Sequence, residues 1–170
     1  MTTFTADSLA LALRDNPDLL RANADATLTN PPVRRTPENA QPGTWSRPQS
    51  FFVPGTLPGL NEIISAAKVG GRGKAYSDMK RKSGQMVKDV IQWASLKPAG
   101  RVSITCTWQE PSRRRDPDNI FAGVKFILDA LVDSGILAGD GWQQVADIRH
   151  KLVLDKDHPG VWVEIVEAQP

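Results

Sequence analysis

The segment 113–119, Arg-Arg-Arg-Asp-Pro-Asp-Asn, holds more groups capable of chemistry than any other stretch of the chain. Its two carboxylates, Asp116 and Asp118, are separated by Pro117, which favours an extended conformation at Asp116. Asp140 follows downstream in a Gly-Asp-Gly turn. Carboxylate oxygens are the ligands that Mg²⁺ prefers in proteins. We therefore expect folding to bring Asp116, Asp118 and Asp140 together as a metal site.

A helix over residues 119–134 is expected to position part of this site. At 100° per residue, Asp118, Lys125 and Asp129 share one stripe within about 20°, and the apolar side chains fall on a separate face. Lys125 would then face the carboxylates and stabilise charge on a phosphate. Ordinary alternatives stay open: Asp118 is suited to cap the helix, and Lys125 and Asp129 to form an i, i+4 ion pair. Asp140 is also a residue type typical of turns.

The remaining elements predict an α+β domain with a mixed β-sheet and packed helices in the order β-α-β-α-β-β. The clearest strand is 101–108, where apolar and polar residues alternate strictly. Helical spacing of apolar residues indicates the longest helix. The other expected elements are strands over 51–53, 145–154 and 161–166, helices over 61–68 and 76–94, and a turn at 156–160 that joins the last two strands.

The first fifty residues differ from the rest in composition. Residues 6–23 read as an amphipathic helix, and residues 24–50 carry five prolines among polar residues, which is typical of a linker. We therefore expect an N-terminal extension over 1–50 and one folded domain of about 120 residues over 51–170.

Composition bounds the class of protein. The chain has 170 residues, of which 40% are hydrophobic and 24% charged, as in folded globular proteins. Cys106 is the single cysteine, which excludes an intramolecular disulfide and a cysteine-based zinc site. Neither a membrane span nor a secretory signal is evident in the sequence. We expect a soluble cytoplasmic protein without a membrane partner.

Basic residues gather locally although the net charge is only +2. A flexible, glycine-containing run precedes and enters the helix over 76–94, and a second group precedes Asp116. Such clusters predict contact with a nucleic-acid backbone, and a solvated surface is the alternative. The candidate DNA-binding residues are Lys68, Arg72, Lys74, Lys80, Arg81, Lys82, Arg113, Arg114 and Arg115.

Together these motifs resemble the RusA-like Holliday junction resolvases, a family common in phages and prophages. The resemblance covers residues 51–166 and rests on RRRDPDN at 113–119, KFILDAL at 125–131 and GDGWQQV at 139–145, with FFVPGTLPGLNE at 51–62 matching the family's first strand and loop. One departure is that the family's paired Asp-Asp at the third site is Gly-Asp in this chain.

The resemblance implies a homodimeric endodeoxyribonuclease that cuts four-way DNA junctions in recombination and repair with Mg²⁺, for which Mn²⁺ could substitute. Asp116, Asp118 and Asp140 match the family's essential aspartates, and Lys125 matches its functional lysine. Asp147 is a further oxygen candidate. The alternatives are a metal-dependent nuclease for flapped or other branched DNA, a non-catalytic DNA-binding module, and an interaction protein that docks through residues 1–50.

Two smaller expectations complete the sequence-based picture. Trp142, close to the third aspartate, is expected to anchor the turn before the next strand, with base stacking as the alternative. For the dimer surface, the leucine-bearing segment 9–20 and the strand 161–166 are both candidates.

Overall fold

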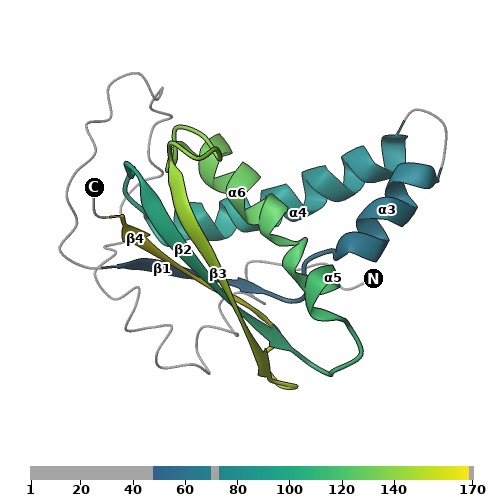
Figure 1. The fold of residues 1–170 in the computed structure, drawn as a ribbon. Helices are drawn as coiled ribbons and strands as arrows, with labels where there is room; N and C mark the ends of the chain where they lie inside the picture. Colours follow the sequence, from purple (N-terminus) through teal and green to yellow (C-terminus); the bar gives the residue numbers. More distant parts are fainter. Residues whose placement is uncertain (1–47, 70–72, 169–170) are drawn as a thin grey trace. The chain divides into compact units, whose positions relative to one another are not determined.

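A four-stranded mixed sheet organises the part of the chain that the computed structural model describes, residues 48–69 and 73–168 (Figure 1). These residues belong to the second of two units into which the chain divides, residues 34–170. The α+β class and the mixed sheet are confirmed. The expected helix over 6–23 and nearly all of the linker lie outside the described residues.

The strand order is β1-β4-β2-β3. Both β1 (Gln49–Pro54) and β2 (Val102–Glu110) pair antiparallel with β4 (Gly160–Glu167), whereas β3 (Val145–Leu154) pairs parallel with β2. β1 and β3 are therefore the two edges of the sheet.

The predicted strand over 101–108 is confirmed as β2. Every second side chain from Val102 to Glu110 is buried and the intervening ones are half-buried, because successive residues of a strand point to opposite faces. The last of the buried side chains of β2 is charged: it is Glu110, which forms an ion pair with Arg115.

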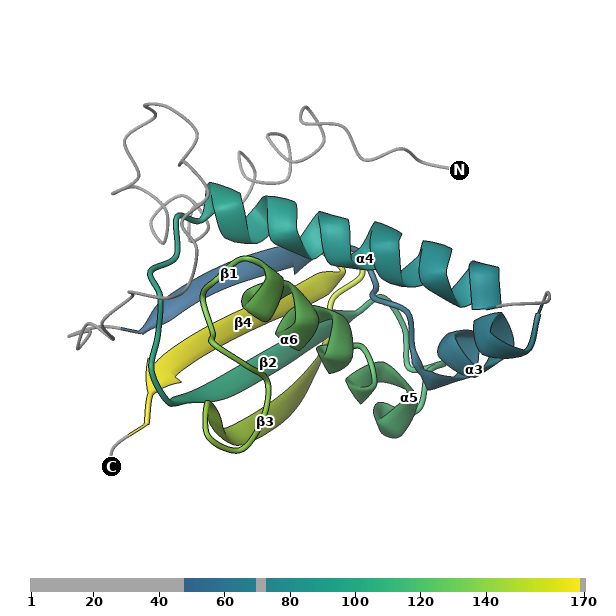
Figure 2. The ribbon, with the colours of Figure 1, turned by 90° about the horizontal axis from the view of Figure 1, so that it is seen from above.

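The four helices of the described residues lie on one face of the sheet (Figure 2). They are α3 (Leu60–Lys68), α4 (Lys74–Trp93), α5 (Pro117–Phe121) and α6 (Val124–Asp133). None of the helices within 48–69 and 73–168 has the length and hydropathy needed to cross a membrane. The core between helices and sheet includes Val87, Val90, Ile91, Ile127, Ala130 and Leu131 from the helices and Val53, Ile104, Cys106, Val163 and Ile165 from the strands.

The second long helix expected from the sequence is in fact two helices, α5 and α6. Gly123 lies at the break, where an added Cβ would meet the Leu57 side chain at 3.1 Å and the Trp108 ring at 3.2 Å. Around it, N–H groups bond carbonyls three residues earlier, which tightens the chain relative to an α-helix. The stripe shared by Asp118 and Lys125, calculated for one continuous helix, therefore does not hold.

The last two strands do not form a hairpin, contrary to the expectation of a simple turn between neighbours. β2 lies between β3 and β4, so the connection over residues 155–159 passes the end of β2. The Asp155 N–H donates to the Glu110 carbonyl at 2.9 Å at this point. This places β3, and not β4, at an edge of the sheet.

Candidate functional site

Arg115 turns inward from the basic run and fixes the chain where β2 ends. Its Nη1 donates to Glu110 Oε1 at 3.2 Å, and its Nη2 donates to the Leu57 carbonyl at 3.0 Å. Burial is the largest influence on the pKa of Glu110 and raises it, while the Arg115 guanidinium offsets part of that rise. Arg115 thus joins β2 to the loop before α3. Because its guanidinium is already bonded to Glu110 and to the Leu57 carbonyl, Arg115 is not available to contact DNA as predicted.

Asn119 makes a second link between the same two regions. Its side chain is buried, and Asn119 Oδ1 accepts a hydrogen bond from the Asn61 N–H at 2.8 Å. Gly59 lies against it so closely that an added Cβ would be 2.6 Å from both Asn119 oxygens. Glu62 Oε2 in turn accepts from the Gly59 N–H at 2.7 Å. These contacts hold α3 and α5 together and fix the start of α5.

Asp116 and Asp118 stand on this fixed support with their carboxylates exposed. Asp116 is the N-cap residue of α5 and Pro117 its first residue, but the Asp116 side chain makes no capping hydrogen bond. The alternative of Asp118 as N-cap is therefore wrong. Neither carboxylate has a hydrogen-bond or ion-pair partner among the described residues. Both are free to bind a ligand from solvent.

Asp140 lies at the other end of the sheet. Because β3 runs parallel to β2 with Val145 opposite Val102, the turn that carries Asp140 precedes β3 beside the beginning of β2. Asp116 follows the end of β2, and nine strand residues span roughly 25–30 Å. Within residues 48–69 and 73–168, no three Asp, Glu, His or Cys side chains form a metal-binding group. The expected convergence of all three aspartates is not observed within one chain.

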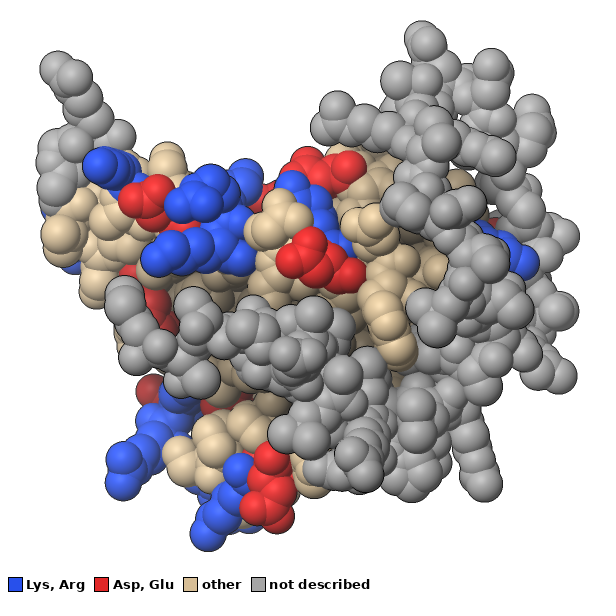
Figure 3. All heavy atoms as spheres, turned by 180° about the vertical axis from the view of Figure 1, so that it is seen from behind, with Lys and Arg blue, Asp and Glu red and all other residues tan. Residues whose placement is uncertain are grey.

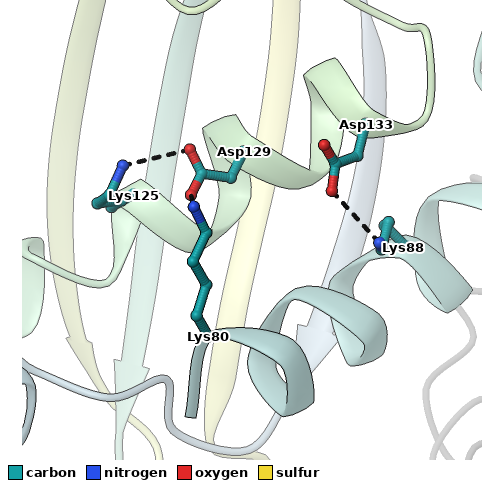
Figure 4. Close-up of polar contacts among 5 residues, drawn as sticks. All are labelled: Lys80, Lys88, Lys125, Asp129 and Asp133. Carbon is teal, nitrogen blue, oxygen red and sulfur yellow. Dashed lines mark hydrogen bonds and ion pairs between the residues drawn. The ribbon is translucent and has the colours of Figure 1, made fainter. Parts of the chain in front are cut away.

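Lys125 is engaged in an ion-pair cluster between α4 and α6 (Figure 4). Its Nζ lies 3.3 Å from Asp129 Oδ1, and Lys80 Nζ from α4 lies 2.9 Å from Asp129 Oδ2. Burial acts to raise the pKa of Asp129, but the two lysines outweigh it and the net pKa is lowered. The hydrogen bond to Asp129 raises the pKa of Lys80. The i, i+4 pair that was the alternative for Lys125 is thus present.

A groove of about 280 Å³ runs along the same two helices. Lys88 Nζ lies 3.3 Å from Asp133 Oδ2 on its wall, and Figure 4 shows these two side chains meeting across α4 and α6. Each lysine that enters the groove therefore meets an aspartate of α6. The cluster joins the helices and leaves little uncompensated positive charge.

The other predicted DNA-binding residues differ in how free they are. Arg81 lies 3.5 Å from Asp78, and basic and acidic side chains are interspersed on the face drawn in Figure 3. Arg72 lies outside the described residues. Five of the predicted residues are exposed and have no acidic partner among the described residues: Lys68, Lys74, Lys82, Arg113 and Arg114.

A histidine that the sequence gave no reason to select lies beside α5. The Trp108 Nε1–H donates to His150 Nδ1 at 3.0 Å, and the Phe121 ring stacks on the His150 ring with centroids 4.3 Å apart. Burial lowers the pKa of His150, so the neutral imidazole is favoured. The alternation of apolar and polar residues along β2 and β3 does not predict these contacts of His150, because they depend on how the two strands are aligned.

Two minor candidates are not supported. Trp142 is 93% exposed, so it does not anchor the turn before β3. Asp147, considered as a further metal ligand, is paired with Arg149 at 2.6 Å between Oδ2 and Nε.

Neither a protein-family model nor a curated protein matches this chain.

Proposed function

We propose that the chain is a Mg²⁺-dependent endodeoxyribonuclease that hydrolyses phosphodiester bonds at four-way DNA junctions. The observation that carries this proposal is the pair of exposed, unpartnered carboxylates, Asp116 and Asp118, at the firmly held start of α5. Elsewhere in the described chain, the aspartates near lysines are already neutralised by them.

The donor set at this position suits a hard cation. Mg²⁺ is commonly held by one or two carboxylates while waters and substrate phosphates complete its coordination. Asp116 and Asp118 can supply the carboxylates, and a DNA phosphate the further oxygens. When bound there, Mg²⁺ would neutralise charge on the scissile phosphate and acidify a water molecule.

The surrounding cations support binding of a phosphate backbone. Arg113 and Arg114 precede the two carboxylates and are exposed, so they can neutralise phosphates on either side of the cut. Lys125 keeps a half-exposed ammonium. An exposed ion pair is worth under about 1 kcal/mol, so Lys125 can exchange Asp129 for a phosphate at small cost.

A cleavage assay tests the proposal directly. Purified protein would be incubated with a labelled four-way junction, a flap and a linear duplex of the same sequence, with Mg²⁺ or with EDTA. We expect junction cleavage only with Mg²⁺. Asp118→Asn should keep junction affinity but reduce the cleavage rate about 100-fold or more, the order found when one group that stabilises transition-state charge is lost.

Asp157→Asn is the matched control, because Asp157 is an exposed aspartate on the turn between β3 and β4. It should cleave like the unmodified protein. Equal cutting of all three DNAs would support the rival nuclease for other branched or flapped DNA. Junction binding without any cleavage would overturn the proposal in favour of a non-catalytic DNA-binding module.

A further inference from the structure

A buried indole depends on His150 for its hydrogen bond. Trp108 is 2% exposed, and its Nε1–H donates to His150 Nδ1 at 3.0 Å. A buried N–H group needs an acceptor, because without one it loses its hydration and gains nothing in return. Nδ1 accepts only through its lone pair, so His150 must be neutral and carry its proton on Nε2. The contact therefore defines both the charge and the tautomer of this histidine.

The same imidazole supports the end of α5 from the sheet. His150 belongs to β3, and its ring stacks on Phe121, the last residue of α5, with centroids 4.3 Å apart and planes inclined by 14°. The Trp108 ring lies against the break that follows, since an added Cβ at Gly123 would be 3.2 Å from it. Two ring side chains of the sheet thus hold the carboxyl end of this short helix.

Phe121 lies one helical turn from Asp118, a proposed metal ligand. The two residues are three apart, so they share one side of α5. The contacts of Arg115 and Asn119 fix the start of the helix, and the stack on Phe121 fixes its end. Because α5 has only five residues, a loss of support at its end would also change the direction of the Asp118 carboxylate.

We infer that His150 is a positioning residue for the Asp116 and Asp118 carboxylates, and that it acts through Phe121 only as a neutral imidazole. Protonation would place an N–H on Nδ1 opposite the Trp108 N–H, so that two donors would face each other and the hydrogen bond would be lost. The inference rests on the proposed function where it concerns metal binding and cleavage. The hydrogen bond and its loss on protonation do not depend on that function.

The surroundings of His150 do not favour its protonation. The titratable groups on its own and the neighbouring elements are Asp147, Arg149 and Lys151 on β3, Cys106 and Glu110 on β2, and Asp116 and Asp118 at α5.

The β3 charges lie an odd number of residues from His150 and point to the other face of the sheet. Burial raises the pKa of the Cys106 thiol to about 12, and Glu110 is paired with Arg115. Burial lowers the pKa of His150, and no charged group among the described residues contributes to that shift. Protonation is therefore expected only below about pH 6.5, the ordinary value for histidine.

Nuclear magnetic resonance of the Trp108 indole N–H tests this coupling without any activity. Its signal would be assigned as the one lost in Trp108→Phe. In the unmodified protein it should move with the titration of the His150 ring, at a midpoint below pH 6.5. In His150→Asn it should stay constant from pH 7.5 to pH 5, because the asparagine Oδ1 can replace Nδ1 as acceptor and does not titrate. An indole signal that does not follow the His150 titration would overturn the inference.

His158→Asn is the matched control. His158 is the other histidine of the chain, and it lies exposed on the turn between β3 and β4 beside Asp155. The variant makes the same chemical change and should leave the titration of the Trp108 signal as it is. Loss of that titration in His158→Asn would assign it to the wrong histidine and overturn the inference.

Binding of Mn²⁺ tests the link to the carboxylates, with the free ion measured by electron paramagnetic resonance. His150→Phe keeps a ring that can stack on Phe121 but leaves the Trp108 N–H without its acceptor. We expect this variant to bind Mn²⁺ about 10-fold more weakly at pH 7.5, the lower end for loss of a group that orients metal ligands. His158→Asn should bind like the unmodified protein. Unchanged affinity in a folded His150→Phe protein would overturn the positioning role.

The pH dependence of nicking separates positioning from a purely structural role. The ratio of the His150→Asn rate to the unmodified rate should rise severalfold from pH 7.5 to pH 5.5, because only the unmodified protein loses the Trp108 bond. The pH dependence of the water nucleophile is common to both proteins and cancels in the ratio. A constant ratio would overturn the positioning role.

If the unmodified protein does not nick the junction, the proposed function fails on its own. The same ratio is then taken from Mn²⁺ affinities, where a rise toward pH 5.5 supports the positioning of the carboxylates and a constant value overturns it.

Discussion

The charged residues between α4 and α6 and those around the start of α5 differ in what they do with their charge. In the first region, Lys80 and Lys125 converge on Asp129, and Lys88 meets Asp133. At the start of α5, Arg115 forms an ion pair with Glu110, whereas the carboxylates of Asp116 and Asp118 are exposed. Compensated charges stabilise the packing of helices, whereas uncompensated charges on a fixed support remain available to a ligand.

The largest effect on stability is expected from Arg115→Ala. Removing the guanidinium would leave Glu110, which is 7% exposed, as a buried charge without a cation. We expect a loss of about 3 kcal/mol in the free energy of unfolding, measured with urea, the lower end for breaking a buried pair. Arg114→Ala, an exposed neighbour, should change it by less than about 0.5 kcal/mol.

The same variant has a defined pH dependence. Burial already raises the folded-state pKa of Glu110 above its unfolded value, and loss of Arg115 would raise it further. A raised carboxyl pKa favours the folded state at low pH and loses that contribution as the pH rises through the folded pKa. The deficit of Arg115→Ala should therefore shrink as the pH is lowered from 7 toward 4. A constant deficit would contradict the ion pair.

A smaller but still clear loss is expected from Gly59→Ala. The new methyl would lie 2.6 Å from the Asn119 backbone oxygen, so α3 and α5 must separate. Overpacking of this kind costs about 1–3 kcal/mol. Gly84→Ala within α4 is the opposite case: nothing lies within 4 Å of the added methyl, and removing a helical glycine should stabilise by about 0.5–1 kcal/mol. Thermal unfolding of both variants would show shifts of opposite sign.

Asp129→Asn should cost less, about 1 kcal/mol, because its two lysine partners are half-exposed and solvent weakens both ion pairs. The folded-state pKa of Asp129 is lowered, so its contribution is present above the unfolded pKa of about 4 and disappears as the pH falls through the folded pKa. Urea unfolding should show a smaller difference from the unmodified protein at pH 2.5 than at pH 7.

The smallest effect on stability and the most informative one on binding is expected from replacing both Arg113 and Arg114 by alanine. Since both side chains are exposed, the free energy of unfolding should change by less than about 0.5 kcal/mol. The slope of log affinity for a junction against log salt should fall by about 2, one unit for each lost phosphate contact. Lys80→Ala should leave that slope nearly unchanged, because Asp129 already neutralises Lys80. A reversed result would move the DNA surface to α4.

Much of the fold could be predicted from the sequence because the signals were local. Alternation located β2, and helical spacing located α4, each within a few residues of the observed bounds. The break at Gly123 was missed because the apolar period continues through it. The close approach of Leu57 and Trp108 that explains the glycine involves residues distant in sequence.

The candidate site was predicted less completely. The spacing of the motif and the family resemblance selected Asp116 and Asp118, and the structure leaves both carboxylates exposed and without a partner among the described residues. The inward turn of Arg115 and the stacking of His150 depend on the register of β2 with β3 and on the loop before α3. No local pattern carries that information.

The sequence by itself determined which segments become strands and helices, and which residues have the chemistry to bind a cation or a phosphate, because both follow from side-chain type and short-range spacing. Only the tertiary structure decided the strand order, the pairing of Lys80 with Asp129, and the separation of Asp140 from Asp116. These depend on which distant segments gain most by packing together. In particular, because β3 pairs parallel with β2, the segment that carries Asp116 and the turn that carries Asp140 lie at opposite ends of the sheet.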